Sequence, residues 1–186
     1  MRKATPEDAA TVIPLICSAI GEIGYVLTGA SEPTQMLDTL EMFFRQKGNR
    51  LSHEQVDVLE REGQIAGFLL AYHGKDIEQL DAPIKQRLLQ MGLSDADVIP
   101  EARPDEYYLD SVAVHPDFQG QGLGTELIRA FEQQAQRLGH SKCLLIVDVD
   151  NTRARALYER LGYTPDGSIE IGGHSYDRMV KQPDGI

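Results

Sequence analysis

The sequence has few of the residues from which covalent or metal-bound frameworks are built. Its 186 residues include no tryptophan and only two cysteines, Cys17 and Cys143. Neither cysteine belongs to a C-x-x-C pair or lies at ligand spacing from a histidine, so we expect neither a disulfide framework nor a metal site. No apolar run approaches the roughly 20 residues of a membrane-spanning helix. Hydrophobic residues make up 41% of the chain, and we expect residues 1–186 to form one globular domain.

Positive charge is also scarce. Eighteen lysines and arginines stand against 29 aspartates and glutamates, which gives a formal net charge of −11. Nucleic acid would be repelled by such a chain unless a local basic patch existed, and the sequence shows none. An acidic surface suits a cationic substrate, although acidity also keeps many proteins soluble. The first residues have no apolar stretch or small-residue cleavage site, so we expect a cytoplasmic protein.

The most informative stretch is residues 107–125, YYLDSVAVHPDFQGQGLGT. Residues 107–115 are rich in aromatic and β-branched side chains and nearly continuously apolar, which predicts a central strand buried on both faces. Pro116 ends this strand because it has no N–H to donate. Glycines at alternate positions follow, and helical periodicity begins at Thr125. The pattern predicts a strand, a glycine loop and a helix.

Such a loop can hold a diphosphate. The first turn of a helix has unpaired N–H groups and a partial positive charge, and glycines let the backbone approach phosphate oxygens closely. The dinucleotide pattern G-x-G-x-x-G would need a glycine where Thr125 stands, and the G-x-x-x-x-G-K-S/T pattern is absent. A Rossmann-type binder is therefore the weakest reading. The glycines taken alone are equally compatible with a tight turn that binds nothing.

The stretch resembles the acetyl-coenzyme A motif of the GNAT superfamily of N-acetyltransferases. That motif is glutamine or arginine, two residues, glycine, one residue, then glycine or alanine, and Gln119, Gly122 and Gly124 meet it. The resemblance implies that the central strand pairs its main chain with the pantetheine arm, while the loop amides hold the pyrophosphate. The coenzyme-binding residues implied are Val112, Ala113 and Val114 on the strand, and Gln119, Gly120, Gln121, Gly122, Leu123, Gly124 and Thr125 in the loop.

A second family motif follows about 30 residues later. It reads N-x-x-A-x-x-x-Y-x-x-x-G-F/Y, and its positions are met by Asn151, Ala154, Tyr158, Gly162 and Tyr163. Asn151 is a good helix N-cap, and Tyr158 lies almost two turns further on the same face. The resemblance implies that both residues contact the coenzyme.

Apolar periodicity predicts the other elements. We expect strands at 2–4, 55–60, 65–72, 142–149, 168–171 and 175–181, a capping box from Thr5 to Asp8, and helices at about 9–20 and 33–46. Gly21 and Gly24 are expected to end the first of these helices. The family resemblance implies an α/β (α+β) fold in which a central mixed, mostly antiparallel sheet of about six or seven strands has helices on both faces.

Residues 74–106 depart from the family pattern, which joins its third and fourth strands by a short turn. This insertion is acidic and is predicted to be helical around Ile84–Leu89. Long loops in compact domains are often functional, so we expect a lid over the acceptor site or a dimer contact. A surface insertion without function is the alternative. The resemblance implies that the acceptor cleft lies beside the first two helices, which makes Glu22, Tyr25 and Glu41 specificity candidates. Plain surface or packing roles are the alternative for each of them.

The resemblance implies an N-acetyltransferase that transfers the acetyl group of acetyl-coenzyme A directly to a primary amine of a small molecule or protein. A main-chain N–H near Val114 would stabilise the oxyanion, and Tyr158 would protonate the leaving thiolate. Asp110 is the predicted base, with structural pairing to an arginine as the alternative, and His115 is expected to anchor the loop. A sensor that binds without turnover is the other functional class. Family habit suggests a homodimer, and the composition predicts no metal and no membrane partner.

Overall fold

Seven strands form one sheet in the computed structural model, which describes residues 1–183. The strand order is β1-β2-β3-β4-β5-β7-β6, and every neighbouring pair is antiparallel except β4 and β5. The strands are β1 (Arg2–Lys3), β2 (Val56–Arg61), β3 (Gln64–His73), β4 (Tyr107–Val114), β5 (Cys143–Asp148), β6 (Thr164–Ile171) and β7 (His174–Lys181). The mixed, mostly antiparallel sheet confirms the predicted fold class.

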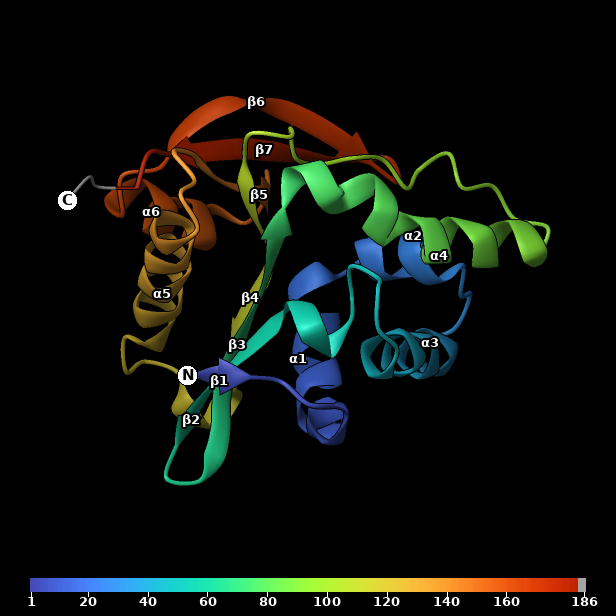
Figure 1. Ribbon diagram of the computed structural model, residues 1–186, viewed down its shortest axis with the longest axis horizontal. Coiled ribbons are helices and arrows are strands. Elements are labelled where there is room, and N and C mark those ends of the chain that lie inside the picture. The colour runs from blue at the N-terminus through green and yellow to red at the C-terminus, as the bar shows by residue number, and fades with distance from the viewer. Residues whose placement is uncertain (184–186) are drawn as a thin grey trace.

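Helices cover both faces of the sheet (Figure 1). One face carries α1 (Ala9–Ile20), α2 (Ile23–Thr28), α3 (Pro33–Arg45) and α4 (Ile77–Gln90), and the other carries α5 (Leu123–Arg137) and α6 (Thr152–Arg160). Short 3-10 turns occupy Pro6–Asp8, His53–Gln55, Gly74–Asp76 and Pro116–Phe118. Within residues 1–183, no helix has the length and apolarity needed to cross a membrane.

Two predicted helix boundaries were wrong. The helix α5 begins at Leu123, two residues before Thr125, because Gly122 takes the left-handed conformation (φ 79°) at the N-cap and Gly124 is already helical. Gly24 does not break a helix but lies inside α2. A Cβ at Gly24 would come within 2.6 Å of the Met36 sulfur on α3, so this glycine allows two helices to approach closely. Gly21 does end α1, with φ at 52°.

Two apolar cores lie on opposite faces of the sheet. The predicted stripe of the first helix is buried in one of them, through Ala9, Val12, Ile13, Ile16 and Ile20. Phe131 and Leu127 of α5 are buried in the other. The strands between the two cores are apolar on both faces, which explains the continuous apolar runs in their sequences.

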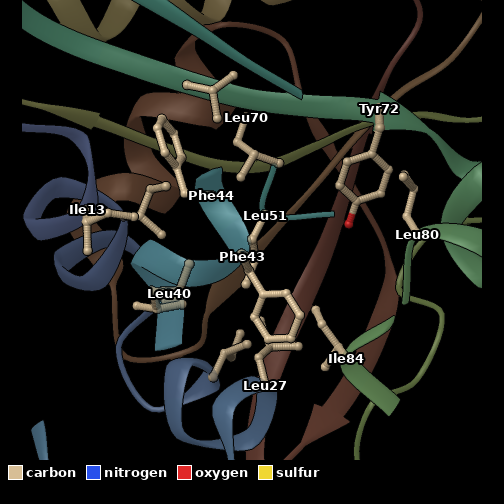
Figure 2. Close-up of a cluster of buried hydrophobic side chains, with 14 of the residues drawn as sticks. Ile13, Leu27, Leu40, Phe43, Phe44, Leu51, Leu70, Tyr72, Leu80 and Ile84 are labelled. Atoms are coloured by element: carbon tan, nitrogen blue, oxygen red, sulfur yellow. The ribbon is translucent and has the colours of Figure 1, made fainter. Parts of the chain in front are cut away.

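The insertion is part of the first core. Four side chains of α4 are buried in it, namely Ile77, Leu80, Ile84 and Leu88. Figure 2 shows Leu80 and Ile84 in the same cluster as Phe43 of α3 and Leu27 of α2. A helix that buries this much apolar surface helps to hold the fold together, whereas the role of the insertion as a lid, a dimer contact or neither stays a prediction.

Two neighbouring leucines on α4 test this role. Leu88 is 2% exposed and Leu89 is 59% exposed. We expect Leu88→Ala to lower the free energy of unfolding by about 2–5 kcal/mol, because the substitution leaves a cavity in the core. Leu89→Ala makes the same chemical change at the surface and should cost less than about 0.5 kcal/mol. Urea denaturation of both variants measures the difference, and equal effects would contradict the packing of α4.

Candidate active site

The central feature of the sheet is a gap between β4 and β5. These parallel strands pair only at Tyr107–Cys143, Tyr108–Leu144 and Leu109–Leu145. Beyond Leu109, β4 continues to Val114 beside β3, and β5 continues to Asp148 beside β7. The two strands therefore separate in the middle of the sheet, and each turns one main-chain edge toward the gap.

A β-bulge marks the place where the strands separate. Leu70 of β3 pairs with Ser111 and Ala71 pairs with Leu109, so Asp110 is the extra residue on β4. A bulge bends its strand and increases the local twist. The bulge thus accounts for the divergence of β4 from β5. It also turns the Asp110 carboxylate toward Tyr72, whose hydroxyl donates to Oδ2 at 2.6 Å.

Main-chain groups of β4 face the gap in alternation. The N–H of His115 donates to the Ala66 carbonyl of β3 at 2.9 Å. Because main-chain groups alternate along a strand, the N–H groups of Val112 and Val114 point to the opposite edge, toward the gap. The carbonyl of Val114 accepts a hydrogen bond from Gln119 Nε2 at 3.4 Å. The gap therefore presents peptide donors to a ligand lying along β4.

A cavity of about 1210 Å³ passes through this gap. Its lining comes from both faces of the sheet, with residues 18–23 at the α1–α2 junction on one face and Gly124, Ile128 and Leu157 on the other. Eight predicted site residues line it, namely Asp110, Val112, Ala113, Val114, Gln119, Gly124, Asn151 and Tyr158. Gly122 and Thr125 line a smaller hollow of about 360 Å³, and Gly120, Gln121 and Leu123 line neither.

The N-terminus of α5 borders the cavity at Gly124. The first bond of the helix ladder runs from the Glu126 N–H to the Gly122 carbonyl at 3.2 Å, so the amides of Leu123, Gly124 and Thr125 have no intrahelical acceptor. Within residues 1–183 no other acceptor bonds these three amides. A Cβ at Gly124 would meet only Leu157 Cδ2, at 3.9 Å, so the space beside this amide is open. These free donors and the positive helix end fit an anionic group such as a diphosphate.

The helix α6 supplies the second predicted pair. Asn151 is the N-cap, as expected, and its Oδ1 accepts from the Ala154 N–H at 3.1 Å. Tyr158 is 9% exposed and lines the cavity. Burial raises the pKa of Tyr158 to about 12, so its phenol keeps the proton at neutral pH and can donate it.

Arg50 forms a buried ion network at the other end of the cavity. Its side chain is 1% exposed. Asp110 Oδ2 accepts from its Nη2 at 2.6 Å and from its Nε at 3.0 Å. Glu101 Oε1 lies 2.8 Å from Nη2, and Asp81 Oδ1 lies 3.3 Å from Nη1. The partners come from the central strand and from the insertion, so the network joins residues 74–106 to β4.

The charges in this network are strongly coupled. Burial alone would lower the pKa of Arg50, but Asp110 and Glu101 raise it well above its ordinary value, so Arg50 is a permanent cation. Burial raises the pKa of Asp81 and of Glu101, and Arg50 offsets only part of that effect. Three carboxylates thus share a single buried guanidinium.

The predicted residues outside these clusters have simpler positions. His115 lies at the turn after β4, where its Nδ1 accepts from the Asp117 N–H at 3.3 Å, which agrees with a loop anchor. Glu22 lines the cavity, whereas Tyr25 and Glu41 do not. Glu41 pairs with Arg45 at 2.7 Å on the exposed side of α3. Arg50 had no sequence signal, because its partner Asp110 lies 60 residues away.

The sequence model of the acetyltransferase (GNAT) family matches residues 25–163, which include β4, the glycine loop and α6. The chain belongs to the GNAT family. That family uses acetyl-coenzyme A as its co-substrate.

Individual relatives cover parts of the chain. It is 34% identical to the mycothiol acetyltransferase of Kocuria rhizophila over 111 residues, 58% of this chain and 34% of that protein. It is 38% identical to the ribosomal protein bS18 alanine N-acetyltransferase of Escherichia coli (strain K12) over 77 residues, 41% of this chain and 52% of that protein. The chain therefore spans between about a third and about half of these relatives.

Solved GNAT structures match over nearly the whole length. One crystal structure, of an acetyltransferase, has a TM-score of 0.75 at 29% identity and covers 98% of both chains. The N-acetyltransferase of Staphylococcus aureus Mu50 has a TM-score of 0.79 at 24% identity, covering 97% of this chain and 98% of its own. At 24% identity, the match to the Staphylococcus aureus structure shows only that the two proteins share a fold.

The contacts of Asp110 favour the arginine-pairing alternative, while its role as base stays a prediction. We expect Asp110→Asn to lower the free energy of unfolding by about 3–5 kcal/mol, because Arg50 loses its nearest carboxylate. Asp38→Asn, on the exposed side of α3, is the matched control and should change the free energy of unfolding little.

The pH dependence of kcat/KM in Asp110→Asn tests whether Asp110 is the base. A profile like that of the wild type excludes the base role, and loss of the acidic limb supports it.

Proposed function

We propose that this chain is an N-acetyltransferase that transfers the acetyl group of acetyl-coenzyme A directly to a primary amine. The observation that carries the proposal is the cavity that crosses the sheet between β4 and β5. A cavity lined from both faces of the sheet would let two substrates meet at the strands.

The residues present suit the two parts of the coenzyme. The amides of Val112 and Val114 would pair with the amide-containing pantetheine arm, as a neighbouring strand would. The free amides at the start of α5 would hold the diphosphate. Arg153 and Arg160 of α6 also line the cavity and add positive charge on this face. When bound, the coenzyme supplies an acetyl thioester.

The reaction forms one bond and breaks one. The amine nitrogen bonds to the thioester carbonyl carbon, the carbon–sulfur bond breaks, the amine loses a proton and the thiolate gains one. The Val114 N–H would stabilise negative charge on the carbonyl oxygen. Tyr158 would donate the proton to the thiolate, since burial keeps its phenol protonated.

A cytoplasmic location, a single domain and a homodimer also follow from composition and family habit. They stay predictions of the proposal. Sedimentation equilibrium tests the dimer by distinguishing one 20.7 kDa chain from two.

Coenzyme binding is tested by calorimetry with the wild type and Gly124→Val. We expect heat with acetyl-coenzyme A and none with NAD. Valine at position 124 should cause no backbone strain, because Gly124 has a helical conformation. The valine side chain would fill the opening beside the free amides. Affinity should fall at least about tenfold, as the loss of one charge-assisted hydrogen bond would cause. An unaltered thermal midpoint serves as the folding control, and unaltered affinity would contradict the phosphate site.

The role of Tyr158 is tested with Tyr158→Phe. We expect kcat to fall about a hundredfold, because general acid catalysis is worth at least that factor, while the KM for acetyl-coenzyme A changes little. Tyr163→Phe removes another buried phenol, one that does not line the cavity, and should keep kcat. The rate of free-thiol release with a panel of amines measures kcat in both variants. Wild-type turnover in Tyr158→Phe would refute the role, and coenzyme binding with no transfer to any amine would indicate a sensor.

A further inference from the structure

The half of the cavity opposite α5 and α6 is lined by acidic side chains from three separate segments. Glu22 comes from the α1–α2 junction, Glu101 from the insertion and Asp148 from the end of β5. We call these three residues the acidic wall. Tyr176 of β7 also lines the cavity and lies among them. Burial raises the pKa of Tyr176, and the charges of Asp148, Glu101 and Glu22 raise it further.

Protein cations neutralise this wall only in part, because Glu101 pairs with Arg50 at 2.8 Å, whereas Glu22 and Asp148 have no ion pair within residues 1–183. Arg50 is shared among Asp81, Glu101 and Asp110. Arg178 is also buried, but it is already paired. Its Nη2 donates hydrogen bonds to both carboxylate oxygens of Glu106 at 2.9 Å, and its Nη1 donates to the main-chain carbonyl of Glu101. His174 lines the cavity without an ion pair in the described residues.

The two halves of the cavity therefore differ in charge. Arg153 and Arg160 line it on α6, where the coenzyme phosphates are proposed to bind. The other half has more carboxylates than cations. Buried or half-buried carboxylates without enough counter-charge are costly unless a ligand provides it.

A second observation points to a missing ligand in this half. Ser111 lies next to Asp110 on β4, lines the cavity and is only 6% exposed. Within residues 1–183, its Oγ has no hydrogen-bond partner. Buried hydroxyl groups nearly always have a partner, so this one indicates a polar ligand between β4 and the acidic wall.

We propose that the acceptor is an amine carrying a second positive charge, such as a linear diamine or polyamine. The proposal rests on the proposed function, since it identifies the substrate of the same site. The acidic wall holds the distal cation beside the ring of Tyr176, where carboxylates and an aromatic face both attract it. Ser111 accepts a hydrogen bond from the reacting amino group as it approaches the strands.

Calorimetry on the chain saturated with coenzyme A tests the charge requirement. Putrescine and spermidine carry more than one ammonium group, n-butylamine has the chain length of putrescine with one, and γ-aminobutyrate replaces the second ammonium by a carboxylate. We expect the two polycations to bind at least about tenfold more tightly than n-butylamine, because a charge-assisted hydrogen bond is worth that factor. Binding of γ-aminobutyrate should be the weakest.

Three variants locate the effect. Glu22→Gln changes an exposed residue whose side chain has no hydrogen bond or ion pair within residues 1–183, so the variant should fold normally. We expect it to lower the preference for putrescine over n-butylamine by at least about threefold, as expected for a partly screened charge. Glu101→Gln should lower it further. Glu41→Gln, which lies outside the cavity and pairs with Arg45, should keep the full preference.

The outcomes separate this inference from the proposed function. Equal affinity for putrescine, spermidine and n-butylamine, or no binding of any of them, overturns the inference. If the inference fails in this way, acetyl transfer to a monoamine or to a peptide N-terminus would still support the proposed function. A preference for polycations that depends on Glu22, with no acetyl transfer to any amine, supports the cation site and overturns the proposed function.

Discussion

The early end of hydrogen bonding between β4 and β5 is the constraint on which the rest of the site depends. Peptide groups inside a sheet are normally all paired, and here the pairing stops after Leu109 and Leu145. The bulge at Asp110 bends β4 away, so its later N–H groups face a cavity instead of a neighbouring strand. The unpaired edge, the cavity and the contact between the two faces of the sheet all follow from this one local irregularity.

The ion network of Arg50 fixes the other side of the cavity. A buried guanidinium must be paired, and its partners lie on β4, on α4 and in the segment after α4. The insertion is therefore tied to the central strand by charge and to α2 and α3 by apolar packing (Figure 2). Because Glu101 also lines the cavity, the segment that departs from the family pattern shapes the half of the cavity opposite α5 and α6.

Local patterns predicted local structure well. The strand, glycine loop and helix from Tyr107 onward, the parallel crossover to β5 and the Asn151 cap are all present. Each depends on residues within a few turns of one another. Gly24 shows where such reasoning fails, because its role is to admit Met36 of another helix. The role of the glycine loop in coenzyme binding stays a prediction: Gly120, Gln121 and Leu123 match the motif region, and they do not line the cavity.

The sequence by itself determined most of the secondary structure and the order of the motifs, because these depend on periodicity and spacing along the chain, and the resemblance of its motifs indicated the family. Only the tertiary structure decided which charges meet. Arg50 and Asp110 are 60 residues apart, and no local pattern shows that they form an ion pair. The same holds for the acidic wall, whose residues come from three segments of the chain. Electrostatic interactions depend on distance in space and on burial, and both are set only when the sheet, the helices and the insertion pack together.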